Sequence, residues 1–188
     1  MGKPGAARPE DMLSRAALRG GEAVLLYYGP GSKDLLDETG LEMIEAARGY
    51  RARIVIVTGT DSQKEFLQSL GLEDAVEGMV SLEGLHRQLG ANFHWPDTLP
   101  RLPDARADIE AFKAGVRDYQ NRTLKPFGSA VGKLLRAPDN PRGVPDLVIE
   151  RAGQDTLGVS TSLVRPFAGR VVYAENMSGR RFTFYAPQ

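Results

Sequence analysis

Two short apolar runs on either side of a helical pattern constrain the fold of this chain most. The first run, AVLLYY, covers Ala23–Tyr28, and the second, RIVIVT, covers Arg53–Thr58. Between them lie a loop with glycines and a helical pattern that ends at Gly49. Short β-branched runs around a helix are typical of a βαβ unit in a parallel sheet that is buried on both faces. The turn after the first strand of such a unit presents backbone N–H groups at a helix N-terminus, where dinucleotide phosphates bind.

Composition excludes several classes of function. The 188 residues include 24 basic and 24 acidic side chains, so no net charge favours nucleic acid or an anionic membrane. There is no cysteine, which removes disulfides, thiolate nucleophiles and cysteine-based zinc sites. The two histidines, His86 and His94, are too few for a three-histidine metal site, and we expect no metal.

The length predicts one domain with a substantial core. We expect residues 1–9 to be a flexible N-terminus and residues 10–188 to form the domain, with a helical and loop insert at about 84–145. The start has no apolar segment of a signal peptide, and no run reaches the ~20 apolar residues of a membrane span. A cytoplasmic protein without membrane contact is therefore the expectation.

The loop after the first strand matches a dinucleotide fingerprint in part. Such a fingerprint has three glycines in the pattern G-x-G-x-x-G, and Gly29 and Gly31 fit the first two. The third position holds Asp34, and the next glycine is Gly40, as if several residues had been inserted. Acidic residues in this loop, Asp37 among them, would repel a pyrophosphate. Two interpretations stay open: the loop binds a nucleotide, or it only closes the βαβ turn.

The end of the second strand carries the polar residues expected at the adenosine end of a cofactor site. They are Thr58, Gly59, Thr60, Ser62 and Lys64. Small polar and basic residues here are typical of NADP sites, whereas NAD sites have an acidic residue, and Asp61 comes too late for that role. Ser62 also fits a capping box with Glu65, and we favour that interpretation for Ser62.

The remaining chain continues the alternation of strands and helices. A short third strand is expected at residues 75–76 or 79–82, followed by the insert with two apolar helical stripes. Residues 146–150 and 170–174 have strand patterns, with a helix at 154–163 between them, and residues 181–185 could form an edge strand. The pattern predicts a doubly wound, mainly parallel α/β sheet with a helical insert.

Three stretches resemble one enzyme family. The first comprises AVLLYYGPG at residues 23–31 and GLEMIEAARGYRARIVIVTGTDSQKEFLQSLG at 40–71. The second is RTLKPFGSAVGKLL at 122–135, and the third, the most specific, runs from VPDLVIERAG at 144 to RRFTF at 184. Together they are similar to the cofactor-binding, Rossmann domain of medium-chain dehydrogenase/reductases, and most of all to the crotonyl-CoA carboxylase/reductase group.

This resemblance implies a zinc-independent, NADPH-dependent reduction of enoyl-CoA thioesters, with an acyl-CoA substrate. It implies cofactor contacts from the residues of the two loops named above and from Glu150 and Glu175 near later strand ends. The family's separate GroES-like domain is absent from this chain. Arg151 stands where the family has histidine, and Tyr173 begins a bulkier segment than the family's small-residue loop. No catalytic residue is implied for this chain.

Two hypotheses of function follow. In the first, the chain is the NADPH-binding part of an enoyl-CoA reductase/carboxylase and requires a catalytic partner domain or a homo-oligomer. In the second, it is a non-catalytic, degenerate Rossmann-like module that acts in protein–protein assembly. The NADP-type strand end favours the first hypothesis, and the acidic residues 33–38 favour the second.

Overall fold

The protein is built on a parallel sheet of five strands in the order β3-β2-β1-β4-β5. This computed structural model describes residues 8–95 and 103–174, except the side chains of Gln154 and Asp155. The strands are β1 (Ala23–Tyr28), β2 (Arg53–Thr58), β3 (Gly78–Ser81), β4 (Leu147–Glu150) and β5 (Arg170–Tyr173). All four strand pairings are parallel, which confirms the predicted doubly wound α/β fold.

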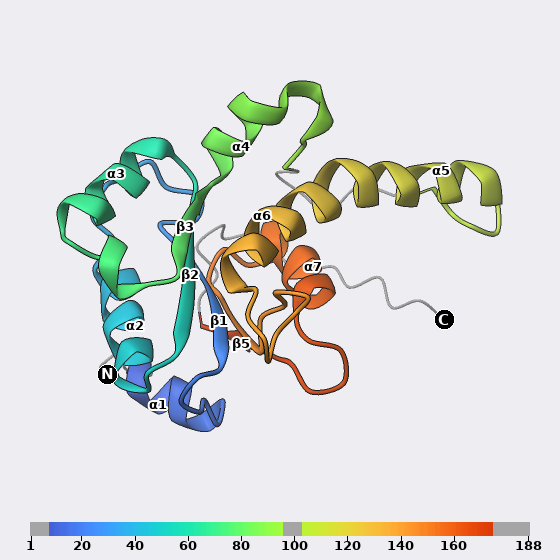
Figure 1. Ribbon diagram of the computed structural model, residues 1–188. Coiled ribbons are helices and arrows are strands. Elements are labelled where there is room, and N and C mark those ends of the chain that lie inside the picture. The colour runs from blue at the N-terminus through green and yellow to red at the C-terminus, as the bar shows by residue number, and fades with distance from the viewer. Residues whose placement is uncertain (1–7, 96–102, 175–188) are drawn as a thin grey trace, which may run out of the picture.

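Helices cover both faces of the sheet (Figure 1). They are α1 (Pro9–Arg15), α2 (Glu38–Gly49), α3 (Asp61–Ser69), α4 (Leu82–Leu89), α5 (Ile109–Tyr119), α6 (Lys125–Leu135) and α7 (Gln154–Leu163). One core cluster joins the sheet to α1, α2 and α3, and a second joins it to α6 and α7. The two clusters explain the apolar runs of β1, β2 and β4, because these inner strands are buried on both faces, whereas β5 at the edge is only partly buried.

The alternation of side chains along β1 shows this division directly. Leu26 and Tyr28 belong to the cluster with α1–α3, while Leu25 and Tyr27 belong to the cluster with α6 and α7. Successive side chains of a strand point to opposite faces, so neighbouring residues enter different cores. At the end of β4 the side chain of Glu150 contacts α7, whereas the side chain of Arg151 contacts Asp37, which precedes α2.

The expected insert contains one long, interrupted helix. α5 runs through a π-helical turn at Gln120–Leu124 into α6, and α5 projects away from the sheet while α6 covers it (Figure 1). Pro126 lacks the N–H that would bond the carbonyl of Arg122, and that carbonyl instead accepts the N–H of His94 at 2.8 Å. The π turn therefore lies where proline breaks the helical ladder, and α6 becomes the helix that crosses between β3 and β4.

The structure sets two boundaries. The helical sequence pattern of residues 10–19 continues to Arg19, but α1 ends at Arg15, since Ala17 adopts a left-handed conformation with φ of 52°. The third strand is the later of the two candidates, Gly78–Ser81. The strand proposed at residues 181–185 lies outside the described residues. None of the helices in the described part of the chain is long and apolar enough to cross a membrane.

Candidate functional site

The strand order places a crevice at the carboxyl ends of β1 and β4. From β1 the chain builds outward through β2 and β3 on one side, and then through β4 and β5 on the other. Open parallel sheets bind ligands at this point, where the connections diverge to opposite faces. A cleft of about 390 Å³ lies here. Its lining comes from the loop after β1, the end of β2, α4, α7 and the single tryptophan: Tyr27, Tyr28, Pro30, Gly31, Ser32, Lys33, Val57, Thr58, Gly59, Thr60, Leu82, Trp95, Ala152 and Thr156.

The loop after β1 requires glycine at its start. Gly29 and Gly31 have φ values of 55° and 75°, a conformation that L side chains rarely adopt. A Cβ on Gly29 would also lie 2.5 Å from the Nε2 atom of Gln63. The sequence therefore placed the tight turn correctly at these two glycines.

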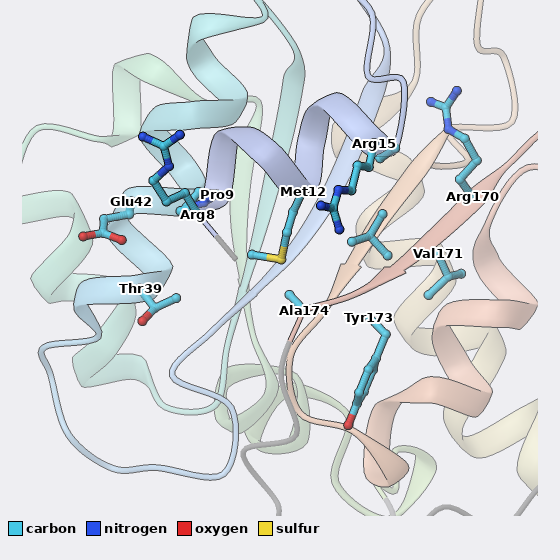
Figure 2. Close-up of a pocket in the computed structure, with 12 residues that line it drawn as sticks. Arg8, Pro9, Met12, Arg15, Thr39, Glu42, Arg170, Val171, Tyr173 and Ala174 are labelled. Carbon is cyan, nitrogen blue, oxygen red and sulfur yellow. The ribbon is translucent and has the colours of Figure 1, made fainter. Parts of the chain in front are cut away.

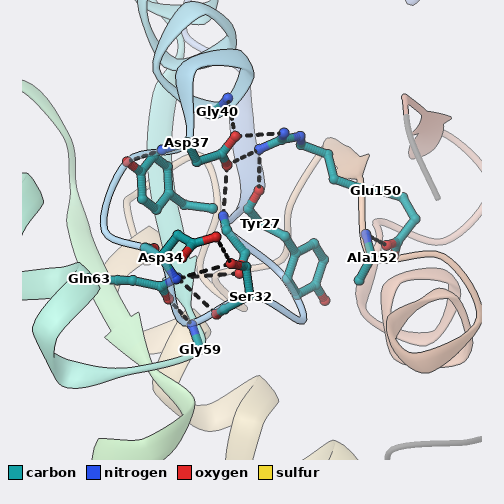
Figure 3. Close-up of polar contacts among 12 residues, drawn as sticks. Tyr27, Ser32, Asp34, Asp37, Gly40, Gly59, Gln63, Glu150 and Ala152 are labelled. Carbon is teal, nitrogen blue, oxygen red and sulfur yellow. Dashed lines mark hydrogen bonds and ion pairs between the residues drawn. The ribbon is translucent and has the colours of Figure 1, made fainter. Parts of the chain in front are cut away.

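Gln63 ties this loop to the end of β2. Its Nε2 donates to the carbonyl oxygens of Gly29, Ser32 and Asp34 at 3.4, 3.1 and 2.9 Å, and its Oε1 accepts the N–H groups of Gly59 and Thr60 at 3.0 and 3.2 Å (Figure 3). The side chain is fully buried. Sequence reasoning did not identify Gln63, although its place three residues after a threonine fits a capping box.

Asp37 lies where the loop meets α2, and it binds both of them. Its Oδ2 accepts the N–H of Gly29 at 2.7 Å, and its Oδ1 accepts the N–H of Gly40 at 3.0 Å (Figure 3). The first of these groups belongs to the glycine turn, and the second to the first turn of α2. These are the groups that a Rossmann fold presents to a pyrophosphate. In this protein a carboxylate of the chain itself occupies that position.

Arg151, which follows β4, completes the environment of Asp37. Its guanidinium contacts both carboxylate oxygens; Nη2 lies 2.9 Å from Oδ1, and Nη1 contacts Oδ2. The two side chains are 1% and 8% exposed. Burial raises the pKa of Asp37, but the Arg151 guanidinium and the N–H groups of Gly29 and Gly40 outweigh it, so the net pKa is lowered. The pair is therefore ionised at neutral pH.

Gly40 lies at a close contact between α2 and β1. It lies in the first turn of α2, where an added Cβ would approach Asp37 Oδ2 to 2.3 Å and both Tyr28 and Arg151 to 2.7 Å. Close packing of the helix against the first strand is the role of the third glycine of a dinucleotide fingerprint. The close contacts at Gly40 agree with that role, and the interpretation of residues 32–39 as an insertion stays a prediction.

Glu150 faces inward and is fully buried. Its Oε1 accepts the N–H groups of Ala152 and Gly153 at 2.9 and 3.1 Å and contacts the hydroxyl of Thr156, while Oε2 accepts from Ser160 at 2.6 Å. These contacts hold the start of α7. The structure therefore places Glu150 beneath the crevice rather than in its lining.

The residues at the end of β2 divide between two surfaces. Thr58, Gly59 and Thr60 line the cleft, whereas Lys64 lines a neighbouring groove of about 660 Å³ beside α4 and α6. Ser62 is exposed and is not the cap of α3. The capping box is formed instead by Thr60, whose hydroxyl accepts the N–H of Gln63 at 3.2 Å, because α3 begins two residues earlier than expected.

Carboxylates of the chain bind N–H groups at two helix N-termini at this edge of the sheet. Asp37 accepts the N–H of Gly40 in α2, and Glu83 accepts the N–H of Asp61 at 2.9 Å in α3, while Glu150 accepts N–H groups just before α7. Helix N-termini attract anions, and the N-termini of α2 and α3 already hold one. The cleft lining itself contains Lys33 and, within the described residues, no acidic side chain.

The geometry fits a dinucleotide in part. The cleft offers threonine hydroxyls, backbone groups of the glycine loop and the aromatic ring of Trp95, which suit a nucleoside. The pyrophosphate position does not fit, because Asp37 holds its N–H donors. Among residues 8–95 and 103–174, no cluster of three metal-binding side chains occurs. Glu175 lies outside these ranges.

A second hollow, of about 710 Å³, lies between α1 and β5 (Figure 2). Met12 and Arg15 line it from the helix, and β5 together with Ala174 lines it from the other side. In the part of the chain that the structure describes, β5 pairs with β4 alone and is an edge strand. This surface is separate from the crevice.

No family model and no curated protein matches this sequence. Solved structures are similar in fold. The crotonyl-CoA carboxylase/reductase AntE in complex with NADP is 24% identical with a TM-score of 0.54, and covers 87% of this chain and 33% of its own. The 2-octenoyl-CoA carboxylase reductase CinF, in complex with NADP and 2-octenoyl-CoA, is 21% identical with a TM-score of 0.56, and covers 96% and 32%. AibC is 17% identical with a TM-score of 0.52, and covers 96% and 35%.

These similarities confirm the expected resemblance at the level of the fold. The chain spans about one third of the length of the AntE and CinF chains that it matches. The matched part has the Rossmann-like architecture.

Proposed function

We propose that this chain is the NADP-binding part of a zinc-independent enoyl-CoA reductase/carboxylase, and that it works with a catalytic domain supplied by a partner. The observation that carries the proposal is the cleft at the carboxyl ends of β1 and β4, with Gly31, Thr58 and Thr60 in its lining. Ligands of open parallel sheets bind at this point of the topology. The NADP in the AntE and CinF structures supports the choice of cofactor.

The charge of the cleft agrees with an anionic ligand. Lys33 supplies a positive charge at its rim, and the threonine hydroxyls can donate to phosphate or ribose oxygens. Lys64 lines the groove next to this cleft, one helical turn after Thr60, and from there would contact the phosphate that distinguishes NADP from NAD. NADPH supplies a hydride when bound. The residues of this chain would bind and orient it, and none of them is assigned a catalytic role.

An acyl-CoA is the proposed substrate of the complete assembly. CinF binds 2-octenoyl-CoA, and this supports the substrate class alone. The acyl-CoA would meet the cofactor at the interface with the catalytic partner.

The test is calorimetric titration of the wild-type chain with NADPH, with NADH as the comparison. We expect saturable binding that prefers NADPH. Lys64→Ala should weaken NADPH binding by roughly tenfold, or ~1.4 kcal/mol, and leave NADH unchanged. Lys113→Ala is the matched control, because Lys113 lies on the projecting helix α5 and pairs with Glu110. A folded wild-type chain that binds no NADPH at millimolar concentration refutes the proposal.

A second candidate function is a non-catalytic module that acts in protein–protein assembly. The observation that favours it is the occupation of the pyrophosphate position by Asp37. The edge strand β5 and its adjoining hollow would be the contact surface. Sedimentation analysis of the chain tests this idea: a monomer at all concentrations, with NADPH bound, would exclude it in favour of the first.

A further inference from the structure

We propose that residues 180–185 of this chain dock into an acidic hollow between α1 and α2. The hollow has a volume of about 570 Å³ and is separate from the crevice. Residues 180–185 read RRFTFY and lie outside the described part of the chain. The proposal does not rest on the proposed function, because no residue assigned to cofactor binding takes part in it.

The hollow combines an apolar floor with a rim of carboxylates. Its floor consists of half-buried side chains that pack on the core: Leu41, Ala46 and Tyr50. Its rim consists of three exposed acids: Glu10, Glu42 and Glu45. Glu45 pairs with Arg48 at 2.6 Å, whereas no basic side chain of the described residues pairs with Glu10 or Glu42. A segment with aromatic rings and positive charges suits such a surface.

Residues 180–185 have this chemistry. Arg180 and Arg181 come directly before Phe182, and Phe184 follows two residues later. In an extended chain alternate side chains share one side, so both phenylalanine rings point the same way. The rings can then cover the apolar floor while the guanidinium groups reach the carboxylates of the rim.

The end of β5 lies close enough for this docking. Ala174 lines the hollow beside β5, and Glu42 lines both that hollow and the acidic one (Figure 2). The chain therefore has one hollow to cross. Residues 175–179 separate Ala174 from Arg180, and an extended chain of this length spans roughly 20 Å.

Charge favours the acidic hollow over the nearer one beside β5. Arg8, Arg15 and Arg170 line the nearer hollow, and Glu42 is its one acid among the described residues. These arginines would repel the two arginines of the segment, because like charges raise the energy of a contact. The carboxylates of the acidic hollow would attract them.

Covalent attachment means that a modest affinity is sufficient. A segment joined by a short linker has an effective concentration on the order of millimolar at a nearby site. Exposed ion pairs contribute little each, so the buried rings would supply most of the affinity. The carboxylates would decide which hollow is occupied.

Limited proteolysis of the full chain by trypsin tests the proposal. Trypsin cleaves after arginine, so loss of the residues after Arg180 or Arg181, followed by intact mass, reports how often the segment is undocked. Glu10→Gln with Glu42→Gln removes two charges without adding a cleavage site. We expect this variant to lose the segment about fivefold faster than the wild type. Phe184→Ser leaves the residues beside the cleaved bonds unchanged and should also accelerate the loss.

A matched control separates the hollow from a general effect of charge. Glu38→Gln with Glu65→Gln removes two exposed acids that line neither hollow, and it should be cleaved at the wild-type rate. Circular dichroism checks that every variant is folded. Equal rates for the wild type and the Glu10, Glu42 variant overturn the proposal. Protection that increases with protein concentration would mean docking on a second copy, which also overturns it.

A second measurement does not depend on cleavage. A fluorescent peptide with the sequence of residues 178–188 is titrated with the full-length Phe184→Ser chain, whose own segment competes weakly. The anisotropy should rise saturably, and binding should be about fivefold weaker when the chain also carries Glu10→Gln and Glu42→Gln. A folded Phe184→Ser chain that binds no peptide at millimolar concentration refutes the proposal.

Discussion

Replacing Gly40 by alanine tests the close contact between α2 and β1, and Gly49 in the same helix gives a matched control. An alanine at either position gains about 1 kcal/mol or less in helix propensity over glycine. At Gly49 an added Cβ meets no atom within 4 Å. Gly49→Ala should therefore stabilise the protein by roughly 0.5–1 kcal/mol.

At Gly40 the same methyl group has no space. It would approach Asp37 Oδ2 to 2.3 Å, and the Tyr28 ring and Arg151 Nη1 to 2.7 Å. All three neighbours are held by hydrogen bonds or by the core, so relief of the clash must disturb the Asp37–Arg151 pair. Overpacking typically costs about 1–3 kcal/mol, and weakening a buried ion pair adds to this. We expect Gly40→Ala to lose about 2–4 kcal/mol in total.

Urea unfolding and thermal unfolding, both followed by circular dichroism, measure the two variants. For a domain of this size, 1 kcal/mol corresponds to a Tm change of about 2–4 °C. The Tm of Gly40→Ala should therefore fall well below that of the wild type, whereas the Tm of Gly49→Ala should rise slightly. If Gly40→Ala is as stable as Gly49→Ala, the close approach of α2 to β1 and the assignment of Gly40 as the third glycine are both wrong.

Three further predictions concern polar contacts. Thr60→Ala removes the observed cap of α3 and should cost about 1 kcal/mol, whereas Ser62→Ala should stay within about 0.5 kcal/mol of the wild type in the same urea assay; equal losses would restore Ser62 as the cap. The pKa of Asp37 is lower in the folded protein than in the unfolded chain. The ionised Asp37 carboxylate therefore stabilises the fold at neutral pH. This stabilisation is lost as the pH falls below the usual carboxyl pKa of about 4 and through the lower pKa of the folded state. Unfolding midpoints measured from pH 7 down to pH 3 should fall, and the fall should be smaller in Asp37→Asn; identical profiles would exclude Asp37 as a source. Glu150→Gln removes one of the acceptors at the start of α7 and should cost about 1–3 kcal/mol, and a loss near zero by thermal unfolding would contradict the bonds assigned to it.

Local patterns in the sequence were sufficient for the strands and for the glycine turn. β1 and β2 have the predicted bounds, since fully buried parallel strands read as continuous apolar runs. The positive φ angles fall at Gly29 and Gly31, where the turn after β1 needs residues without a side chain. The predicted helix at 154–163 also has the observed bounds.

Predictions that depended on the start of a helix were less accurate. Ser62 with Glu65 and Thr60 with Gln63 both fit the pattern of a capping box, and the spacing alone could not decide between them. In the structure Thr60 is the N-cap of α3, because the side chain of Gln63 also donates to the carbonyls of the glycine loop. The start of α3 is therefore fixed by a contact with another segment and not by local helix propensity.

The sequence by itself determined the class of fold, the position of the crevice and the presence of acidic residues beside it, because these follow from periodicity and from residue type. Only the tertiary structure decided what the acids do. Asp37 and Arg151 are 114 residues apart, and no local pattern pairs them. Parallel strands bring the carboxyl ends of β1 and β4 together, so the charge that would repel a pyrophosphate lies within reach of the cation that neutralises it. The physical reason is that a buried guanidinium requires an anion, and the fold supplies one from the chain itself.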